Sequence, residues 1–433
     1  MSLSARGVLL GVFCGLLAIV GLWTHIGLVV VAAAALGIWC TALVAERREV
    51  RQLPIQVEAI LPDVVRLGVP TQLTTKIRNT AQRLVQVEWL QAYPAPLIGP
   101  AQRLEQATIE IADSHASTTS ILPVELGSTR LPQPAFRIAG KYGLASWNRV
   151  EGESLGDISV MPDTLRNYTQ DAAASQLGNR HRRAIGQGSE LEELRDYRPG
   201  DSLRMIDWKS TAKNGSHVIR ETSEEQHLEI MIAVDAGRSS NLLSGQLSLL
   251  GHYVNVAARL AEFATLQGDR VGLLVFAQQT LVRIPPGRGR ASLARIRAAL
   301  ATVNSQSIEA NPLGAAFDLL RLLRRRSLVV LLSDFEHADT TGQQARATQL
   351  LGGRHRVVLA SVRNRDVDEL AVSSDPHWLT PQIALAAQDA QSDRAAVARQ
   401  LRNLGAVLVH ASDTELDQQV LATYKRLRAD RRI

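Results

Sequence analysis

The chain has 433 residues and a mass of 47.2 kDa, and its 45% hydrophobic and 21% charged content predicts two or three folded domains and excludes a mostly disordered protein. Its 48 Lys and Arg residues exceed its 42 Asp and Glu residues by too little to indicate a nucleic-acid binder of this length. The only two cysteines, Cys14 and Cys40, lie in an apolar stretch, which excludes a disulfide framework and a cysteine-based zinc site.

The N-terminal stretch over residues 7–45 contains no Asp, Glu, Lys or Arg. It is about twice as long as the ~20 residues that one helix needs to cross a bilayer. We therefore expect residues 1–46 to form two transmembrane helices, at about 7–23 and 26–45, with a turn at Trp23, Thr24 and His25. A cleaved signal peptide and a buried soluble hairpin are the alternatives, but the apolar run is much longer than the 7–15 residues usual in signal peptides.

Basic residues flank this stretch on both sides. Arg6 precedes it, and Arg47, Arg48 and Arg51 follow it. The positive-inside rule then predicts a multi-pass protein of the bacterial inner membrane whose ends and globular domains are cytoplasmic.

Residues 50–162 change character. Apolar and polar residues alternate over short runs, such as 55–61, 73–78 and 85–90, which Pro, Gly and Asn residues separate. No run of helical period intervenes, so the pattern predicts a β-sandwich-like domain. Such a domain is a spacer or a module that docks a partner, and its sequence contains no catalytic spacing.

Residues 163–225 begin as a polar linker and continue as a dense charged run over 186–225. Acidic and basic residues interleave there around a turn at Pro199, Gly200 and Asp201, with Ile206 and Trp208 as two expected apolar anchors. One interpretation is a set of solvated loops. The other is a recognition surface, or a site in which Arg195, Arg198 and Arg204 hold an anionic group.

Residues 226–433 alternate between apolar strands and helices, which predicts an α/β domain with a mostly parallel sheet covered on both faces. The expected strands are 228–235, 270–277, 327–334, 355–362 and 406–411, with a hairpin strand at 280–284. The expected helices are about 243–266, 290–303, 313–325, 341–351, 391–404 and 414–428.

Two of the expected strands end in an acidic residue, Asp235 and Asp334. Ligands of parallel sheets bind at the carboxyl ends of the strands, so these residues with Ser239 are candidates for a Mg²⁺ site. The alternative is that each aspartate caps the following helix. The chain has no P-loop, HExxH or GxSxG motif, which excludes three common enzyme classes.

The run HRRAIGQGSELEELRDYRPGDSLRMIDWKSTAK at residues 181–213, followed by a strand ending in Asp, resembles the defining core of the family called domain of unknown function 58. The segment KYGLASWNR at 141–149 is a weaker match. The resemblance implies a membrane-anchored protein with a von Willebrand factor A-like, Rossmann-like domain that works beside a MoxR-type AAA+ ATPase.

Metal-binding von Willebrand A domains carry a DxSxS motif, a Thr and a further Asp. By this resemblance Asp235, Ser239 and Asp334 match, whereas Gly237 replaces the first Ser and Asn311 lies near the Thr position. The resemblance therefore implies a degenerate site, with Asp235, Ser239, Asn311 and Asp334 as its candidate ligands.

We expect a non-enzymatic scaffold or adaptor that docks a MoxR-type ATPase and assembles or remodels other proteins. Two other hypotheses stay open: a Mg-dependent hydrolase acting through Asp235 and Asp334, and an extracellular adhesin, which the arginine flanks oppose. The candidate partner-binding residues are Glu190, Arg195, Tyr197, Gly200, Asp201, Arg204, Asp207, Trp208 and Lys209.

Overall fold

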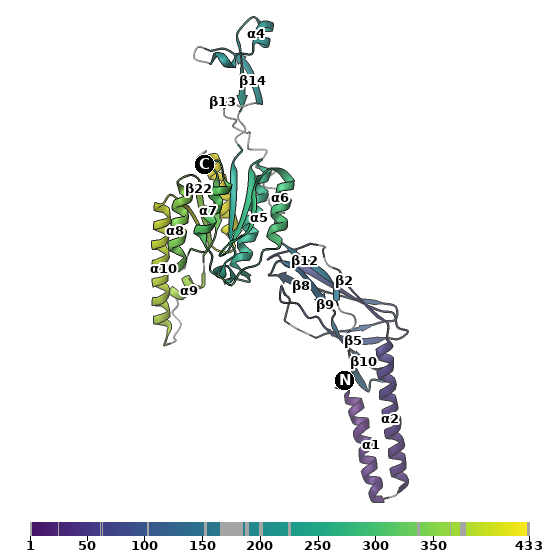
Figure 1. The fold of residues 1–433 in the computed structure, drawn as a ribbon. Coiled ribbons are helices and arrows are strands. Elements are labelled where there is room, and N and C mark those ends of the chain that lie inside the picture. The colour runs from purple at the N-terminus through teal and green to yellow at the C-terminus, as the bar shows by residue number, and fades with distance from the viewer. Residues whose placement is uncertain are drawn as a thin grey trace. The chain divides into compact units, whose positions relative to one another are not determined.

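The computed structural model describes residues 2–24, 26–60, 62, 64–101, 104–150, 154–164, 185–186, 190–198, 202–223, 227–335, 338–363, 365–372 and 378–430 (Figure 1). The chain divides into two compact units. The first comprises Met1–Asp163, Gly245–Gly251 and Ala301–Asn304, and the second Thr164–Ser244, His252–Leu300 and Ser305–Ile433.

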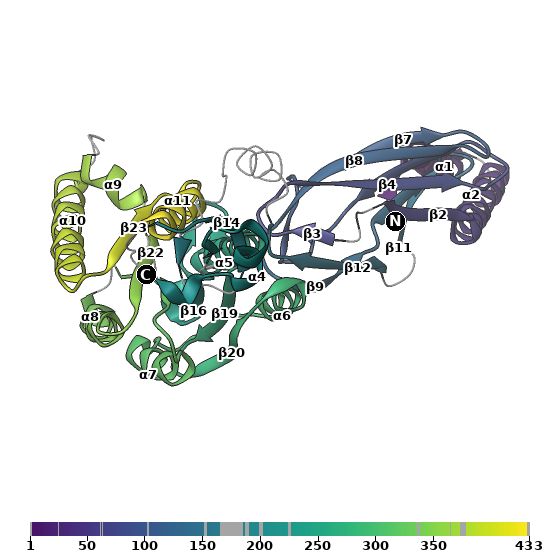
Figure 2. The same ribbon diagram turned by 90° about the horizontal axis from the view of Figure 1, so that it is seen from above.

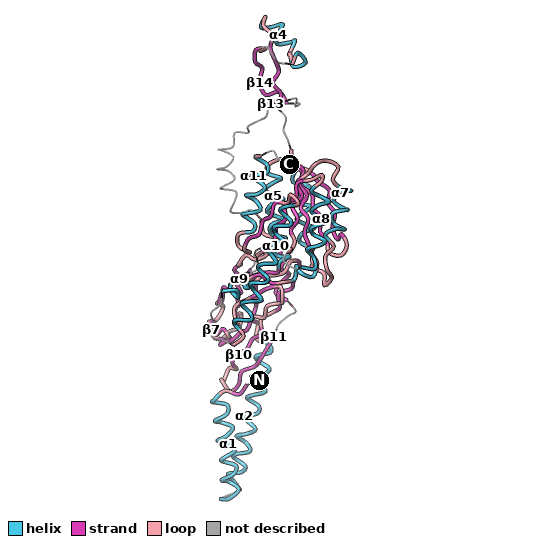
Figure 3. The backbone as a smooth tube through the Cα atoms, turned by 90° about the vertical axis from the view of Figure 1, so that its left-hand side faces the viewer, coloured by secondary structure: helices cyan, strands magenta, loops and turns pink. Residues whose placement is uncertain are grey.

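The apolar N-terminus forms two helices that run side by side, α1 (Ala5–Thr24) and α2 (Ile26–Gln52) (Figures 1 and 3). Large apolar side chains such as Leu9, Ile26 and Ile38 are exposed on them. Among the described helices, α2 alone is long and apolar enough to cross a membrane, and Ala5–Val20 of α1 is a shorter apolar segment. The predicted helices are therefore confirmed, with one candidate span in place of the two predicted; His25 lies outside the described residues.

The predicted β-rich region forms three sheets, with strand orders β1-β11-β10-β5-β7, β2-β4-β8-β6 and β3-β12-β9. All pairs are antiparallel except β3 with β12. The strands are β1 (Ser2–Leu3), β2 (Ile55–Ile60), β3 (Val64–Arg66), β4 (Thr71–Asn79), β5 (Val85–Leu90), β6 (Leu97–Ile98), β7 (Glu105–Ile109), β8 (Ser114–Pro123), β9 (Gly127–Pro132), β10 (Ala135–Ala139), β11 (Ala145–Val150) and β12 (Ser154–Met161).

Two of these sheets pack face to face. Ile55 and Ile77, from β2 and β4, share a buried cluster with Val87 of β5 and Phe136 of β10. The alternation in the sequence places these residues on one face of each strand, so the cluster forms the interior of a sandwich. Val50, near the end of α2, packs in the same cluster, so the helix is part of the domain core.

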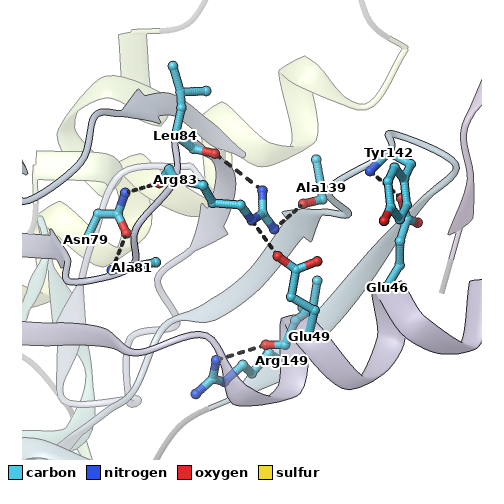
Figure 4. A network of polar contacts seen from close by, with 10 residues as sticks. Glu46, Glu49, Asn79, Ala81, Arg83, Leu84, Ala139, Tyr142 and Arg149 are labelled. Carbon is cyan, nitrogen blue, oxygen red and sulfur yellow. Dashed lines mark hydrogen bonds and ion pairs between the residues drawn. The ribbon is translucent and has the colours of Figure 1, made fainter. Parts of the chain in front are cut away.

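The end of α2 is attached to the turn between β10 and β11 by a buried carboxylate (Figure 4). Glu46 is 0% exposed. Its Oε1 accepts hydrogen bonds from the backbone N–H of Tyr142 (2.7 Å) and Leu144 (3.3 Å), and its Oε2 accepts one from Ala145 (3.2 Å). A Cβ at Gly140 would collide with this carboxylate, so the glycine leaves room for it.

Two arginines strengthen the same junction (Figure 4). Arg83 pairs with Glu49 at 2.9 Å, and Nη1 of Arg149 donates to the carbonyl oxygens of Val50 (3.0 Å) and Leu53 (2.5 Å). Burial lowers the pKa of the Arg149 guanidinium. The last turn of α2 is thus bonded to the sheet through both side chains and backbone.

The second unit contains a six-stranded sheet of order β20-β19-β16-β21-β22-β23, in which only the β19–β20 pair is antiparallel. The strands are β16 (Glu229–Asp235), β19 (Arg270–Phe276), β20 (Thr280–Gly287), β21 (Leu328–Leu332), β22 (Arg356–Val362) and β23 (Val407–Ala411). These parallel pairs confirm the predicted mostly parallel sheet. Its central strands are buried along nearly their whole length.

Helices cover both faces of this sheet (Figure 2). On one face, α7 (Pro312–Leu322), α8 (Ala338–Gly352) and α10 (Thr380–Asn403) share a buried cluster with alternate strand residues such as Met231 and Ala233. On the other, the rings of Phe263 in α5 (Leu249–Leu266) and Tyr424 in α11 (Leu416–Ala429) meet edge to face at 5.9 Å. The remaining helices are α6 (Gly289–Ala301) and α9 (Arg365–Val372).

Two helix boundaries differ from the predictions. The predicted helix over 243–266 begins only at Leu249, because Gly245 has a left-handed φ of 66° in a turn between the two-residue strands β17 (Leu243–Ser244) and β18 (Leu247–Ser248). The predicted helix over 391–404 begins at Thr380, where a Pro occupies the first turn. Helix α9 was not predicted.

We expect Glu46→Gln to lower the free energy of unfolding of the first unit by about 3 kcal/mol, because an amide nitrogen would replace one of two buried acceptors. Differential scanning calorimetry of the full chain in detergent micelles measures this. The matched control is Glu49→Gln on the same helix, whose carboxylate is about one-third exposed and should cost under about 1 kcal/mol. Equal effects of the two substitutions would contradict the role assigned to Glu46.

Candidate functional site

The acidic residues predicted at the strand ends are brought together. Strands β16 and β21 are parallel neighbours with Val234 opposite Leu332, so Asp235 and Asp334 follow at the same edge of the sheet. Both residues are buried, with 1% and 5% of their surface exposed. The site therefore lies under the loops that leave the sheet.

The Asp235 carboxylate accepts hydrogen bonds at both oxygens. The backbone N–H of Gly237 donates to Oδ1 at 2.8 Å, and the hydroxyl of Ser333 donates to Oδ2 at 2.6 Å. Nε2 of Gln344 in turn donates to the Ser333 hydroxyl at 2.5 Å and to the Asp334 carbonyl at 3.3 Å. Neither Ser333 nor Gln344 was predicted, because no sequence spacing relates a strand-terminal Ser to a Gln in the next helix.

Burial raises the pKa of Asp235 from 3.8 to about 6. The hydrogen bonds from Ser333 and Gly237 oppose this shift, while the nearby charges of Asp334 and Glu309 add to it. No basic side chain is among the causes of the shift. The folded chain therefore binds a proton at Asp235 more tightly than the unfolded chain does.

The loop over residues 305–311 closes over the end of β16. The backbone N–H of Gln306 donates to Ala236 O at 2.7 Å, and that of Arg238 donates to Ile308 O at 2.8 Å. An ion pair joins Arg238 to Glu309 at 2.6 Å, although both side chains are mostly exposed. A Cβ at position 237 would lie 2.8 Å from the nitrogen and Cβ of Ala310, so only glycine allows this approach.

Asn311 and Ser239 are the other two proposed metal ligands, and each lies on a different element from the two aspartates. The side chain of Asn311 caps α7 by accepting from the Gly314 N–H at 2.8 Å, and Ser239 lies on the 3₁₀ helix η2 (Arg238–Asn241). No group of three or more His, Cys, Asp or Glu residues in the described ranges is placed to hold a metal ion. Both Asp235 oxygens and the Asn311 oxygen thus each accept a hydrogen bond from within the protein.

Three buried polar atoms in this part of the unit have no hydrogen-bond partner among the described residues: the Tyr253 hydroxyl, Oε1 of Gln344 and Oγ1 of Thr348. Tyr253 is fully buried, and burial and the charge of Asp334 raise its pKa. Ser361 and the backbone of Val362 lie near enough to oppose that rise, but neither makes a hydrogen bond of ordinary geometry with it. The strand end is thus a cluster of buried polar groups in an apolar core.

The raised pKa of Asp235 predicts a pH dependence of stability. The folded chain binds a proton more tightly than the unfolded chain does, so this group's contribution is lost as the pH rises from about 4 through about 6. The difference between 3.8 and about 6 corresponds to about 3 kcal/mol. Asp235→Asn should therefore raise the melting temperature of the full chain at pH 7.5 and leave it nearly unchanged at pH 4.

Melting curves at the two pH values check this, with Asp389→Asn on an exposed position of α10 as the control that should change neither. Equal stabilisation by Asp235→Asn at both pH values would contradict the assignment.

The charged segment forms a small sheet of order β13-β15-β14 with a short helix (Figure 3). Strand β14 (Glu190–Asp196) pairs antiparallel with β15 (Val218–Ser223), and β13 (Ile185–Gly186) pairs with the other edge of β15. The 3₁₀ helix η1 (Leu203–Met205) and α4 (Trp208–Asn214) lie between β14 and β15 in the chain. The segment is therefore folded locally.

Asp207 is the N-cap of α4. Its Oδ1 accepts from the backbone N–H of Lys209 (3.0 Å) and Ser210 (3.3 Å), and its own N–H donates to Val218 O at 2.9 Å. Gly215 ends the helix with a left-handed φ of 71°. Asp207 thus shapes the segment, which makes it an unsuitable probe of direct partner contact.

Ile206 and Trp208 were both expected to be apolar anchors, and Ile206 is one. It is only 9% exposed and forms an antiparallel β-bridge with Ile219. The prediction for Trp208 was wrong, because it is 67% exposed on the first turn of α4. Its ring meets that of His217 edge to face at 6.5 Å, and the Tyr197 ring meets His217 at 6.3 Å. An amphipathic pattern cannot separate an anchor from an exposed aromatic in so short a helix.

Other members of the predicted binding set are less fully described. Gly200 and Asp201 lie outside the described residues, as do the side chains of Glu190, Arg195 and Arg204. Tyr197, Asp207, Trp208 and Lys209 are brought together around β15 and α4.

Comparison with known proteins finds a family of unknown function. The model of the family described as "Protein of unknown function DUF58" matches residues 193–375. Uncharacterized proteins of Mycobacterium bovis and of two strains of Mycobacterium tuberculosis are each 28% identical over 262 residues, which cover 57% of this chain and 81% of theirs.

Among solved structures, a CARDB domain from Pyrococcus furiosus, in complex with di-metal ions, and a FixG-related protein from Vibrio parahaemolyticus each cover 25% of this chain. The matches cover 93% and 96% of those chains, at 13% and 14% identity and a TM-score of 0.17 in both cases. At these TM-scores, the two structures carry no information about the function of this chain.

Proposed function

We propose that this protein is a membrane-anchored scaffold or adaptor that docks another protein through its charged segment, residues 186–213, and through the strand ends near Asp235 and Asp334. The observation that carries the proposal is the exposed apolar surface of the charged segment. Trp208 and Leu203 are 67% and 68% exposed on a locally folded element. Exposed aromatic side chains on a preformed element are typical anchors of protein interfaces.

The partner that we propose is a MoxR-type AAA+ ATPase, and the task is the assembly or remodelling of other proteins. This rests on the resemblance of residues 181–213 to the domain of unknown function 58 family, which the family match over residues 193–375 supports. The sheet order and the helices on both faces support a von Willebrand A-like fold for the second unit.

The geometry at Asp235 favours docking over hydrolysis. A Mg-dependent hydrolase needs carboxylate oxygens that the cation and the substrate can reach. Both Asp235 oxygens instead accept hydrogen bonds from the protein, and the loop over 305–311 closes the strand end. The ion pair between Arg238 and Glu309 then presents opposite charges on the outside of that loop, as a docking face does.

For the location we propose the bacterial inner membrane, with α1 and α2 both inserted and the globular units in the cytoplasm. The candidate span α2 and the apolar run of α1 support insertion. Arg6, Arg47, Arg48 and Arg51 at the same end of the two helices support the orientation. A reporter enzyme that works only in the cytoplasm should therefore be active when it is fused to the C-terminus of this chain.

Docking through the charged segment predicts that Trp208→Ala abolishes retention of the ATPase in a pull-down from native membranes with a non-hydrolysable nucleotide. An alanine at this exposed position removes an apolar anchor without opening the core, so the melting temperature should stay unchanged. Loss of one interface tryptophan should weaken binding by at least about 2 kcal/mol, or about thirty-fold.

Trp378→Ala is the matched control, because Trp378 is also exposed (76%) but lies just before α10, outside the charged segment. This variant should retain the ATPase as the wild type does. The proposal is wrong if Trp208→Ala binds normally, or if the wild-type chain retains no ATPase.

A further inference from the structure

We propose that the junction between the two N-terminal helices and the β domain binds the headgroups of anionic phospholipids through a basic collar, defined as Arg6, Arg47, Arg48, Lys141 and Tyr142. This inference rests on the proposed membrane anchoring. It adds a specific contact, because two of the five residues come from a β-turn about ninety residues along the chain from α2.

The β10–β11 turn is fixed at one end of both helices. At α1, the backbone N–H of Ser4 donates to Leu144 O at 3.0 Å, and the hydroxyl of Ser4 donates to Gly143 O at 2.5 Å. At α2, Glu46 accepts the three N–H groups described above. Lys141 and Tyr142 are therefore held where the apolar part of both helices stops, which is the level of the headgroups if the helices are inserted.

No ion pair between described residues neutralises the positive charge of the collar. Its four basic residues are exposed, and none of them forms an ion pair within the described part of the chain. The only acidic residues in the first 53 positions are Glu46 and Glu49, and residues 139–150 contain none. Glu46 is buried in the turn and Glu49 pairs with Arg83, so neither of these two carboxylates pairs with a cation of the collar in the described structure.

Aromatic rings orient two of these cations. The Arg47 guanidinium lies 5.9 Å from the Trp147 ring centroid, and the Lys141 ammonium lies 5.9 Å from that of Tyr142. Tyr142 is 58% exposed. Basic and amphipathic aromatic side chains together at the end of an apolar helix match the chemistry of an anionic headgroup layer, whose phosphates bind the cations.

The test uses the full chain in detergent micelles and measures binding of short-chain phosphatidylglycerol, with short-chain phosphatidylcholine and inorganic phosphate as comparison ligands. We expect phosphatidylglycerol to bind more tightly than both. At about 1 kcal/mol for each basic residue, the double variant Arg47→Ala, Lys141→Ala should raise its Kd about thirty-fold. The charge-preserving variant Arg47→Lys, Lys141→Arg should keep the wild-type Kd within about three-fold, and melting temperatures verify folding.

The matched control is Lys76→Ala, Arg78→Ala, which removes one Lys and one Arg from an exposed face of β4 in the same domain and should leave the Kd unchanged. The collar would be overturned if both double alanine variants raised the Kd for phosphatidylglycerol equally. It would also be overturned if inorganic phosphate bound as tightly as phosphatidylglycerol. Flotation of the chain with carbonate-washed liposomes separately tests the anchoring. A chain that floats without preferring phosphatidylglycerol overturns this inference alone, and one that does not float overturns the proposed anchoring.

Discussion

The carboxylate of Glu46 has only backbone N–H groups among its described partners. Taking a charged carboxylate out of water costs many kcal/mol unless hydrogen bonds replace its hydration. Here three N–H groups of one turn do so, and the absence of a Cβ at Gly140 leaves room for the carboxylate. The helix end, the turn and the strands β10 and β11 therefore fold as one interdependent element, on which the basic collar depends as well.

Asp235 is a second buried carboxylate that accepts hydrogen bonds, and its pKa is raised. There too a buried carboxylate accepts a backbone N–H, but its second oxygen depends on the Ser333 hydroxyl, which Gln344 holds. Burial raises the pKa of Asp235 against these two donors, and the charges of Asp334 and Glu309 add to the rise. Asp235 therefore loses its proton at a higher pH than an exposed aspartate does.

Much of the fold could be predicted from periodicity. The strands of the parallel sheet follow from near-continuous apolar runs, and the sandwich strands follow from alternation such as that over 73–78. The start of α5 could not be predicted, because the left-handed turn at Gly245 competes with a good helical pattern. In the candidate sites, the placement of Asp235 and Asp334 at the same edge of the sheet could be predicted from the parallel direction of their strands. The roles of Ser333, Gln344 and Glu46 depend on tertiary contacts that leave no spacing in the sequence.

The joint at Glu46 also determines where the chain can be cut. The apolar stretch ends at residue 45, which makes a start just after it an obvious choice for a soluble β domain. A start even a few residues later would lack Glu46 and leave three inward-facing N–H groups of the β10–β11 turn unpaired. A start beyond Val50 and Leu53 would also remove part of the sandwich core. The boundary in hydropathy is thus not the boundary of the folding unit, since the last two turns of α2 belong to the domain that follows them.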